Sequence, residues 1–228
     1  PELLPSHGSF LMGAAAPQAA AAAGGGDYVG NDTCLGCHED QHKRFKKTVM
    51  GKIFAQPRTP LEARGCESCH GPGKAHVEAG GGKETIPVNF GKNSKTSLED
   101  QNAACIQCHA RGAQIFWKGS PHEMRGMSCV DCHTVKAERQ PSLLAETRFA
   151  EPPATNKQFV KPTQIELCLD CHKMQRAQIQ RSSHMPFREG KINCTSCHNP
   201  HGSPNPKQLT EATITENCVK CHTERRGP

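Results

Sequence analysis

The sequence predicts an elongated chain that is mostly coil, with short α-helices, almost no sheet and a core that is not built from side chains. Three observations lead to this prediction. Hydrophobic residues make up only 35% of the 228 residues, and aromatic residues 4%, which is little for an ordinary packed interior. The chain has 21 Gly and 17 Pro, which favour turns and loops. All 14 cysteines fall into one short string that recurs seven times.

The recurring string is C-x-x-C-H. Its cysteines are Cys34 and Cys37, Cys66 and Cys69, Cys105 and Cys108, Cys129 and Cys132, Cys168 and Cys171, Cys194 and Cys197, and Cys218 and Cys221. Every copy ends in a histidine, and these are His38, His70, His109, His133, His172, His198 and His222. No cysteine is left over, so one chemistry has to explain all of them.

C-x-x-C-H is the attachment string of c-type haem. Two thiols three residues apart lie on one side of a turn and can form thioether bonds with the two vinyl groups of a porphyrin. The next histidine then binds iron as the proximal ligand. Zinc ribbons pair their C-x-x-C strings, which seven copies do not allow, and neither zinc nor a disulfide across the turn explains a histidine after every copy. We therefore expect seven covalently attached haem c groups, stacked as the core of a multihaem cytochrome c.

The formal net charge of +6 is not a nucleic-acid signal in such a protein. Seven haems would add about 14 propionate charges, and each ferric iron would return one positive charge. We expect the basic residues to pair with propionates. Covalent haem attachment takes place outside the cytoplasm, so we expect an exported protein, periplasmic or on the cell surface. The chain begins at Pro1 without a charged n-region, which favours a mature form.

Three segments are expected along the chain. Residues 1–12 form an N-terminal arm with one histidine, and residues 13–26 form an Ala/Gly-rich tether. The apolar letters "SFLMGAAAPQAAAAA" are too short and too interrupted for a membrane span. Residues 27–228 form the heptahaem region.

The heptahaem region repeats with a unit of two strings, which begin at residues 34 and 66, 105 and 129, and 168 and 194. One position lies 16 or 17 residues after the first cysteine of each unit and holds Met50, His122 and His184. A second position shortly follows the even-numbered strings and holds His76, Lys136 and His201. Each unit therefore offers two additional side chains, most of them histidines.

These positions are candidates for the distal ligand, which binds iron opposite the proximal histidine. Seven side chains could fill seven distal positions: His7, His42, His76, His122, His184, His201 and Met50. We expect His76 to bind the iron of a haem other than the one at His70. His42 could instead cap a helix, Met50 could only pack against a porphyrin, and Lys136 could pair with a propionate.

The phrases around the strings resemble the MtrA/DmsE type of decahaem cytochrome. They are "YVGNDTCLGCHED", "GCESCHGPGKAHVEAGG", "SCVDCHTV", "CTSCHNPHGS" and "CVKCHTERRGP", and the resemblance covers about residues 27 to 228. Proteins of this type carry electrons across the periplasm and through an outer-membrane barrel. The resemblance implies a near-linear row of bis-histidine haems, with distal roles for His76, His122, His184 and His201.

This chain departs from the resemblance in three respects. Met50 and Lys136 stand where the family generally has histidine, and the family continues past "RRGP" into three further haems. An N-terminal arm is added instead. A seven-haem version could be too short to bridge a membrane alone, which weakens the conduit role.

Electron transfer is the expected function, because fully ligated irons offer no open position to a substrate. The partners would be redox proteins, with no nucleic acid and no membrane span. Two architectures stay open, a periplasmic carrier or outer-membrane conduit component and a head-to-tail polymer, of which we favour the polymer slightly. A multihaem reductase with one five-coordinate iron is the alternative from the class of enzymes.

The N-terminal arm suggests how a polymer could form. The string at Cys218 opens a fourth unit, whose mid-unit position would fall past Pro228. His7 lies on a long tether and is expected to bind the iron of a C-terminal haem in the next molecule. The first candidate is the haem at His222. Such a head-to-tail contact need not close into a ring. A disordered tail and a reach within one molecule are the alternatives.

Overall fold

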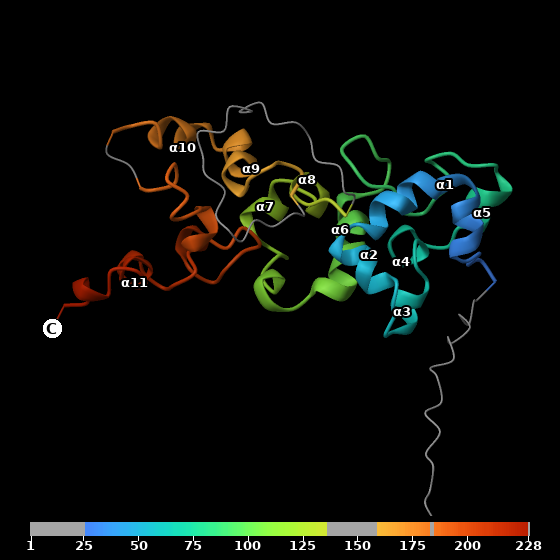
Figure 1. The fold of residues 1–228 in the computed structure, drawn as a ribbon, viewed down its shortest axis with the longest axis horizontal. Coiled ribbons are helices and arrows are strands. Elements are labelled where there is room, and N and C mark those ends of the chain that lie inside the picture. The colour runs from blue at the N-terminus through green and yellow to red at the C-terminus, as the bar shows by residue number, and fades with distance from the viewer. Residues whose placement is uncertain (1–25, 136–158, 183–184, 228) are drawn as a thin grey trace, which may run out of the picture.

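The computed structural model of the chain describes residues 26–135, 159–182 and 185–227. These residues follow one another along an elongated molecule, from α1 and α5 at one end to α11 at the other (Figure 1). The helices on the first half of this path are α1 (Asn31–Lys46), α2 (Val49–Phe54), α3 (Pro60–Ala63), α4 (Glu67–His70), α5 (Lys74–Glu78), α6 (Leu98–His109) and η1 (Gly112–Gln114). Those on the second half are α7 (Pro121–Met124), α8 (Cys129–Cys132), α9 (Gln164–Cys171), α10 (Lys173–Gln178), η2 (Cys194–Ser196), η3 (Pro206–Gln208), α11 (Ile214–Val219) and η4 (Thr223–Arg225).

About half of the described residues are helical, and they contain no sheet. Their only strand-like pairings are two isolated antiparallel bridges, between His133 and Phe159 and between His198 and Leu209. The predicted fold class, coil with short helices and almost no sheet, is confirmed. Most of these helices are shorter than the 12 to 15 residues, roughly, that an isolated helix needs in water, so packing has to hold them.

Side-chain caps decide where several of the helices begin. The hydroxyl of Thr163 accepts a hydrogen bond from the N–H of Glu166 at 3.1 Å, and the Glu166 carboxylate accepts one from the N–H of Thr163 at 3.1 Å. Thr213 and Glu216 repeat this reciprocal arrangement at α11. Ser97 caps α6 by accepting from the N–H of Asp100. Each cap starts a helix that carries the next C-x-x-C-H string.

The seven strings alternate between two local forms. The odd-numbered strings lie on or at the ends of the longer helices α1, α6, α9 and α11, and α1 is kinked at His38. The even-numbered strings form single turns, which are α4, α8 and η2. After each single turn the chain returns to the string, where the N–H groups of Val88, Val160 and Thr210 donate to His70, Cys132 and Cys197. The even-numbered strings are therefore fixed by neighbouring coil instead of by a helix.

An amide side chain joins the two strings of each unit. Asn31 Oδ1 accepts from the N–H of Cys66 at 2.9 Å, and Asn102 Oδ1 accepts from the N–H of Cys129 at 2.8 Å. In the third unit Gln164 Oε1 accepts from the N–H of Thr195 at 3.1 Å. We call these three contacts the amide clamps. They fix the long helix of each unit against the single turn that follows it.

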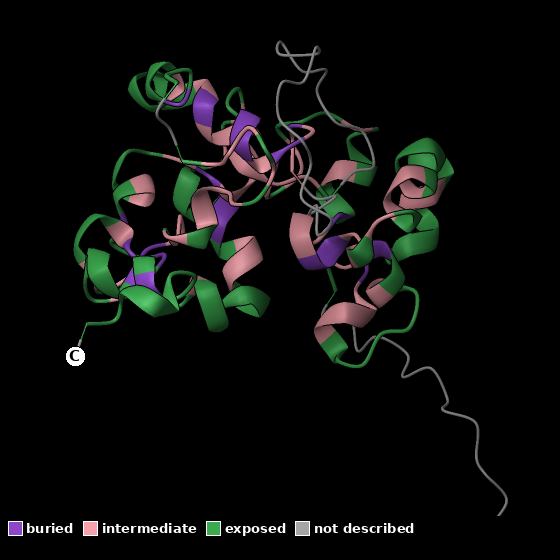
Figure 2. Ribbon diagram, turned by 60° about the vertical axis from the view of Figure 1, so that its left-hand side comes forward, coloured by how far each residue is buried: buried purple, intermediate pink, exposed green. Residues whose placement is uncertain are grey.

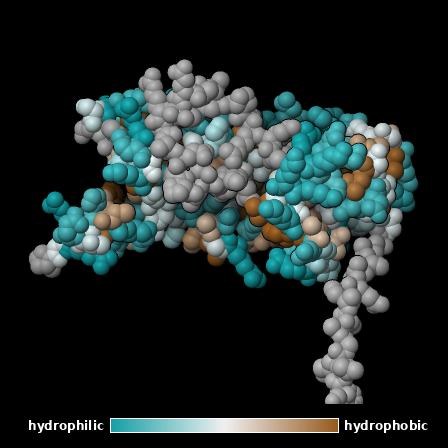
Figure 3. Space-filling model, viewed as in Figure 1, coloured by the Kyte–Doolittle hydropathy of each residue, from teal (hydrophilic) through white to brown (hydrophobic). Residues whose placement is uncertain are grey.

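The side-chain core is small. Ile165, Leu169 and Ile179 form one buried cluster, with Phe187 packed against it. Buried residues are scattered along the ribbon in Figure 2, not gathered at one centre. Among the described residues, more large hydrophobic side chains are exposed than buried, and some gather in apolar patches on the face shown in Figure 3. A cofactor that covers apolar surface would supply what this core lacks.

Within the ranges given above, no helix is both long and apolar enough to cross a bilayer. The proposed N-terminal arm, residues 1–12, and the tether up to residue 25 lie outside the described residues.

Candidate haem-binding sites

The C-x-x-C-H strings lie next to one another in the order of the sequence. Within each unit the first cysteines meet, because the thiols of Cys34 and Cys66 are in hydrogen-bond contact. The same contact joins Cys105 with Cys129 and Cys168 with Cys194. Every two-string unit thus brings two attachment points together.

Between units the cysteines interact electrostatically. Cys69 lies within electrostatic range of Cys108, and Cys132 lies within that range of Cys171. Cys197 interacts in the same way with Cys218 and Cys221 of the seventh string. Each string therefore has the next string of the sequence as a neighbour, from α1 to α11.

Burial raises the pKa of several of the thiols. Burial raises the pKa of Cys34 to about 11, with further contributions from Cys66 and Glu67. Burial also raises the pKa of Cys132 to about 11. None of the 14 cysteines forms a disulfide, and no group of three or more Cys, His, Asp or Glu side chains converges anywhere in the described part. A zinc site needs converging thiolates, so the donor set fits thioether attachment better than zinc.

Three string histidines face a second histidine from outside the strings. The rings of His38 and His76 have centroids 6.1 Å apart with planes 17° apart. His133 and His201 are 5.9 Å apart, again at 17°. His172 and His122 are 6.2 Å apart at 77°. Each pair joins a predicted proximal histidine to a predicted distal one.

These separations fit two imidazoles that bind one iron from opposite sides. A metal–imidazole nitrogen bond is about 2 Å long, which places two such ring centroids about 6 Å apart. The donor chemistry of haem iron, two imidazoles, is present in each pair. The residues present therefore fit a haem at His38, at His133 and at His172.

Hydrogen bonds at Nδ1 make Nε2 the ring nitrogen that can serve as a metal ligand. His122 Nδ1 lies 2.7 Å from the carbonyl oxygen of Pro200, and His70 and His198 place Nδ1 2.8 and 2.9 Å from the carbonyls of Val88 and Lys207. A carbonyl can only accept, so Nδ1 carries the proton in all three. This fixes the tautomer and the ring orientation that a ligand needs.

The central histidines are also kept neutral, which is the form that binds a metal. Burial lowers the pKa of His133 to about 4, and His201 and His109 lower it further. Burial and then His122 lower the pKa of His201. Burial, His122 and His198 lower the pKa of His172.

Two segments far apart in the sequence interlock around the two central pairs. The loop 112–122 contacts residues 199–202, and we call this contact the clasp. Asn199 Nδ2 donates to the carbonyl of Ala113 at 2.8 Å, and His122 donates to Pro200. Gly202 has φ +102°, and a Cβ there would collide with the carbonyl of Phe116. The clasp carries His122 and His201, one distal candidate from each segment.

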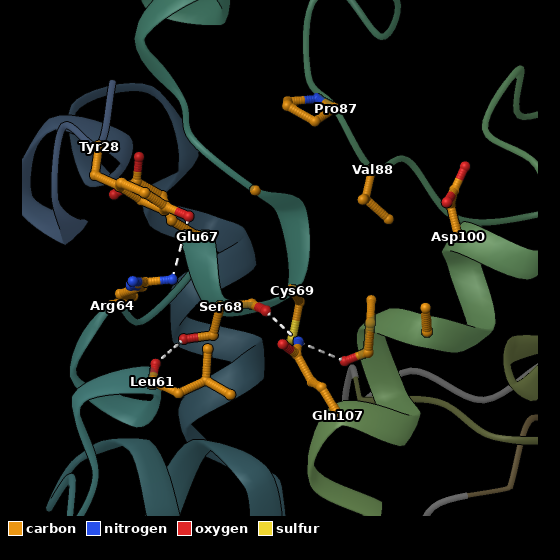
Figure 4. A pocket seen from close by; sticks show the side chains of 13 residues that line it. Tyr28, Leu61, Arg64, Glu67, Ser68, Cys69, Pro87, Val88, Asp100 and Gln107 are labelled. Atoms are coloured by element: carbon orange, nitrogen blue, oxygen red, sulfur yellow. Dashed lines mark hydrogen bonds between the residues drawn. The ribbon is translucent and has the colours of Figure 1, made fainter. Parts of the chain in front are cut away.

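A cavity of about 570 Å³ lies between α4 and α6, beside Cys69 (Figure 4). This volume is in the range of cofactor sites. On one side of the cavity, Gln107 Nε2 donates a hydrogen bond to the carbonyl of Ser68 at 2.7 Å. The guanidinium of Arg64 lies 4.5 Å from the Tyr28 ring centre, on another side. The cavity lies next to the second and third strings, and its wall includes apolar side chains and one cation, the guanidinium of Arg64.

The remaining predicted ligands are not paired in this way. His42 lies half-buried on α1, and within the described residues its ring contacts no string histidine. Met50 is half-buried on α2. His7, His184 and Lys136 lie outside the described residues. Their roles as iron ligands stay predictions.

Sequence reasoning missed the amide clamps and Trp117 of the clasp. An Asn three residues before the first cysteine recurs in "NDTC" and "NAAC" and could have pointed to Asn31 and Asn102. Gln164 stands one position earlier, so it breaks that pattern. The single tryptophan gave no signal, because its partner His201 is 84 positions away by chain number.

Three family models match the chain. "Doubled CXXCH motif" matches residues 184–227, "Cytochrome c-type protein NrfB-like" matches residues 66–150, and "Cytochrome c554 and c-prime" matches residues 13–71. Together the three models match parts of both ends and of the centre of the chain.

Curated relatives agree with these models. The multihaem cytochrome MtrA of Shewanella baltica (strain OS185) is 35% identical over 201 residues, which cover 87% of this chain and 54% of the relative. Cytochrome c-type protein NrfB of Escherichia coli O6:H1 is 25% identical over 148 residues, covering 58% and 70%. Cytochrome c-554 of Nitrosomonas europaea is 30% identical over 114 residues, covering 46% of each. The chain thus spans about half the length of MtrA.

The recurring strings, the paired imidazoles and every one of these likenesses agree, and the chain is a multihaem c-type cytochrome with covalently bound haem c, similar to MtrA.

Proposed function

We propose that the chain transfers electrons along a row of seven low-spin haems c, one on each C-x-x-C-H string. The observation that carries this proposal is the order of the strings, in which the cysteines of each string interact with those of the next string in the sequence. When bound, the haems supply iron that changes between the ferric and ferrous states. Because consecutive strings are neighbours, haems bound to them would follow one another in the same order and could pass electrons from one to the next.

The protein's own residues hold the row in place and keep it unreactive. The cysteines would hold each haem, and the string histidine would bind its iron. His76, His201 and His122 would supply a second imidazole at His38, His133 and His172, respectively, which they face. Two imidazoles leave no open position for a substrate at these irons. The geometry therefore favours passage of electrons over chemistry on a bound molecule.

The count of seven is tested by intact mass. The mass of protein matured in a host that attaches c-type haem should exceed that of the 24.7 kDa apoprotein by seven haem groups. A double variant, Cys218→Ala with Cys221→Ala, should lose one haem and keep six. A native mass with six or fewer haems would overturn the count.

Low-spin ligation is tested by the optical spectrum. The reduced protein should bind no carbon monoxide without denaturant, and the oxidised protein should show no high-spin band. Carbon monoxide binding by the native protein would contradict full ligation and favour the reductase alternative. If Met50 binds iron, a band near 695 nm in the oxidised protein, roughly where Fe–Met bonds absorb, should vanish in Met50→His.

The site of action follows from the chemistry of attachment, and we place the protein outside the cytoplasm, in the periplasm or at the cell surface. Redox proteins that dock at the two ends of the row are the partners. Assembly into a head-to-tail filament through His7 stays a prediction. Electron microscopy of the wild type and of His7→Ala tests it, and filaments that persist in the variant would refute it.

A further inference from the structure

Two buried polar atoms of the clasp lack a partner. The indole Nε1 of Trp117 and the imidazole Nδ1 of His201 are both buried and form no hydrogen bond. Trp117 is nine-tenths buried, and the two ring centroids are 6.4 Å apart. More than about 90% of buried polar groups in proteins have a partner. Two unpartnered atoms on neighbouring rings therefore point to one shared partner.

Both atoms are donors once His201 serves as an iron ligand. A neutral imidazole that binds metal through Nε2 carries its proton on Nδ1. The indole nitrogen can only donate. The two rings cannot satisfy each other, so the missing group is an acceptor with room for two N–H bonds.

Backbone acceptors nearby are already in use. The carbonyl of Pro200 accepts from His122 at 2.7 Å. The carbonyl of Trp117 accepts from the N–H of Ser120 at 2.9 Å, and that of Asn199 accepts from the N–H of Gly202 at 3.0 Å. A carboxylate has two oxygens and accepts several bonds, and charge makes each bond stronger than a neutral one.

We propose that Trp117 and His201 together bind one carboxylate group, a propionate of a haem beside the His133–His201 pair. This inference rests on the proposed binding of haem there. Trp117 then acts as a positioning residue. It holds the propionate against Nδ1 of the distal ligand, and so fixes the His201 ring and sets the negative charge next to the iron.

Isotope labelling tests the contact directly, because the chain has one tryptophan. The indole nitrogen is labelled with ¹⁵N, and the haem carboxyl groups are labelled with ¹³C through carboxyl-labelled aminolaevulinic acid. Solid-state NMR of the fully reduced, diamagnetic protein should show dipolar dephasing of the indole nitrogen by a carboxylate at hydrogen-bond range, an N···O distance of about 2.9 Å. The indole N–H should also exchange slowly with solvent.

Two results would overturn the proposal. An indole N–H that exchanges rapidly identifies water as the partner. Slow exchange without dephasing identifies an acceptor other than a haem carboxylate. Neither result touches the proposed function, which the haem count and the low-spin spectrum measure independently.

A variant adds a functional readout. Trp117→Phe keeps an aromatic ring but removes the N–H, so the propionate charge is less neutralised and ferric iron is favoured. The midpoint potential of one haem should shift negative, without a change in haem count or spin state. Phe116→Leu, which alters packing in the same loop, is the matched control and should not cause this shift. An unchanged potential in Trp117→Phe would contradict the proposed role.

Discussion

The first two-string unit and the central units place their predicted distal histidines in different ways. His76 is held locally, because its Nδ1 lies 3.0 Å from Thr85 Oγ1 and 3.1 Å from the carbonyl of Gly82, and it faces His38 of the same unit. In the centre, His122 of the second unit faces His172 of the third. His201 of the third unit faces His133 of the second, so these two units exchange histidines.

This difference has consequences for folding and for redox coupling. The first unit can complete its His38 site within the unit, from His38 and His76, which are 38 positions apart by chain number. At the central sites, segments about 50 to 80 residues apart in the sequence have to meet. Bringing them together costs loop-closure entropy, which is lost before the stabilising contacts form. A disturbance at one central ligand must also reach the other, because His122 is hydrogen-bonded to the residue that precedes His201.

The largest effect is expected from a variant that disrupts the exchange of histidines between the second and third units. His122→Ala removes the ligand facing His172 and also the bond to Pro200 that orients the neighbouring His201. Two haems should therefore change ligation, as counted by electron paramagnetic resonance of the oxidised protein. His76→Ala is the matched control and should alter one haem only. Equal counts in the two variants would show that the clasp does not couple the central sites.

A second variant tests the local anchoring of the first unit. The buried carboxylate of Glu67 accepts from the N–H groups of Val29, Gly30 and Gly73 at 2.8 to 2.9 Å. Glu67→Ala leaves these donors without their partner and should lower the free energy of unfolding of the first unit by about 3 kcal/mol. Denaturant titration followed by the spectrum of the haem at His38 measures it.

The control for this variant is Glu78→Ala, which removes an exposed carboxylate from α5 of the same unit. That change should stay within about 0.5 kcal/mol of the wild type. If both variants unfold at the same denaturant concentration as the wild type, Glu67 does not anchor the N-terminal segment.

Variants at two of the amide clamps compare the stability of the first unit with that of the second. Asn102 is buried and makes two bonds, to Cys129 and to the carbonyl of Met127, whereas the bond of Asn31 to Cys66 is exposed. Asn102→Ala should cost about 2 kcal/mol of unfolding free energy and Asn31→Ala about 1 kcal/mol or less. Thermal unfolding of both variants compares them, and a larger loss in Asn31→Ala would reverse the ranking.

The smallest expected effect concerns a helix cap. Thr163→Ala removes the reciprocal cap of α9 and should cost about 1 kcal/mol. Thr163→Ser keeps the hydroxyl and should recover most of the loss. A full loss in the serine variant would assign the effect to the missing methyl group and not to the cap.

Sequence alone was enough to predict which residues carry the chemistry. Attachment needs two thiols and an imidazole within five residues, so the strings are visible without a fold. The regular offsets in each unit singled out His76, His122 and His201, and the low hydrophobic content predicted a coil-rich chain. Requirements of this kind involve residues close together in the chain, so the spacing of the residues shows them directly.

Only the tertiary structure decided which histidine faces which string. His76 and His201 occupy equivalent places in their units, yet nothing in their spacing shows that His76 faces a string of its own unit and His201 a string of the unit before it. Trp117 and the Asn102 clamp escaped notice for the same reason, since their partners lie far away in the chain. Side chains that act across such distances are brought together by loop geometry and packing, which are properties of the folded chain and leave no local pattern in the sequence.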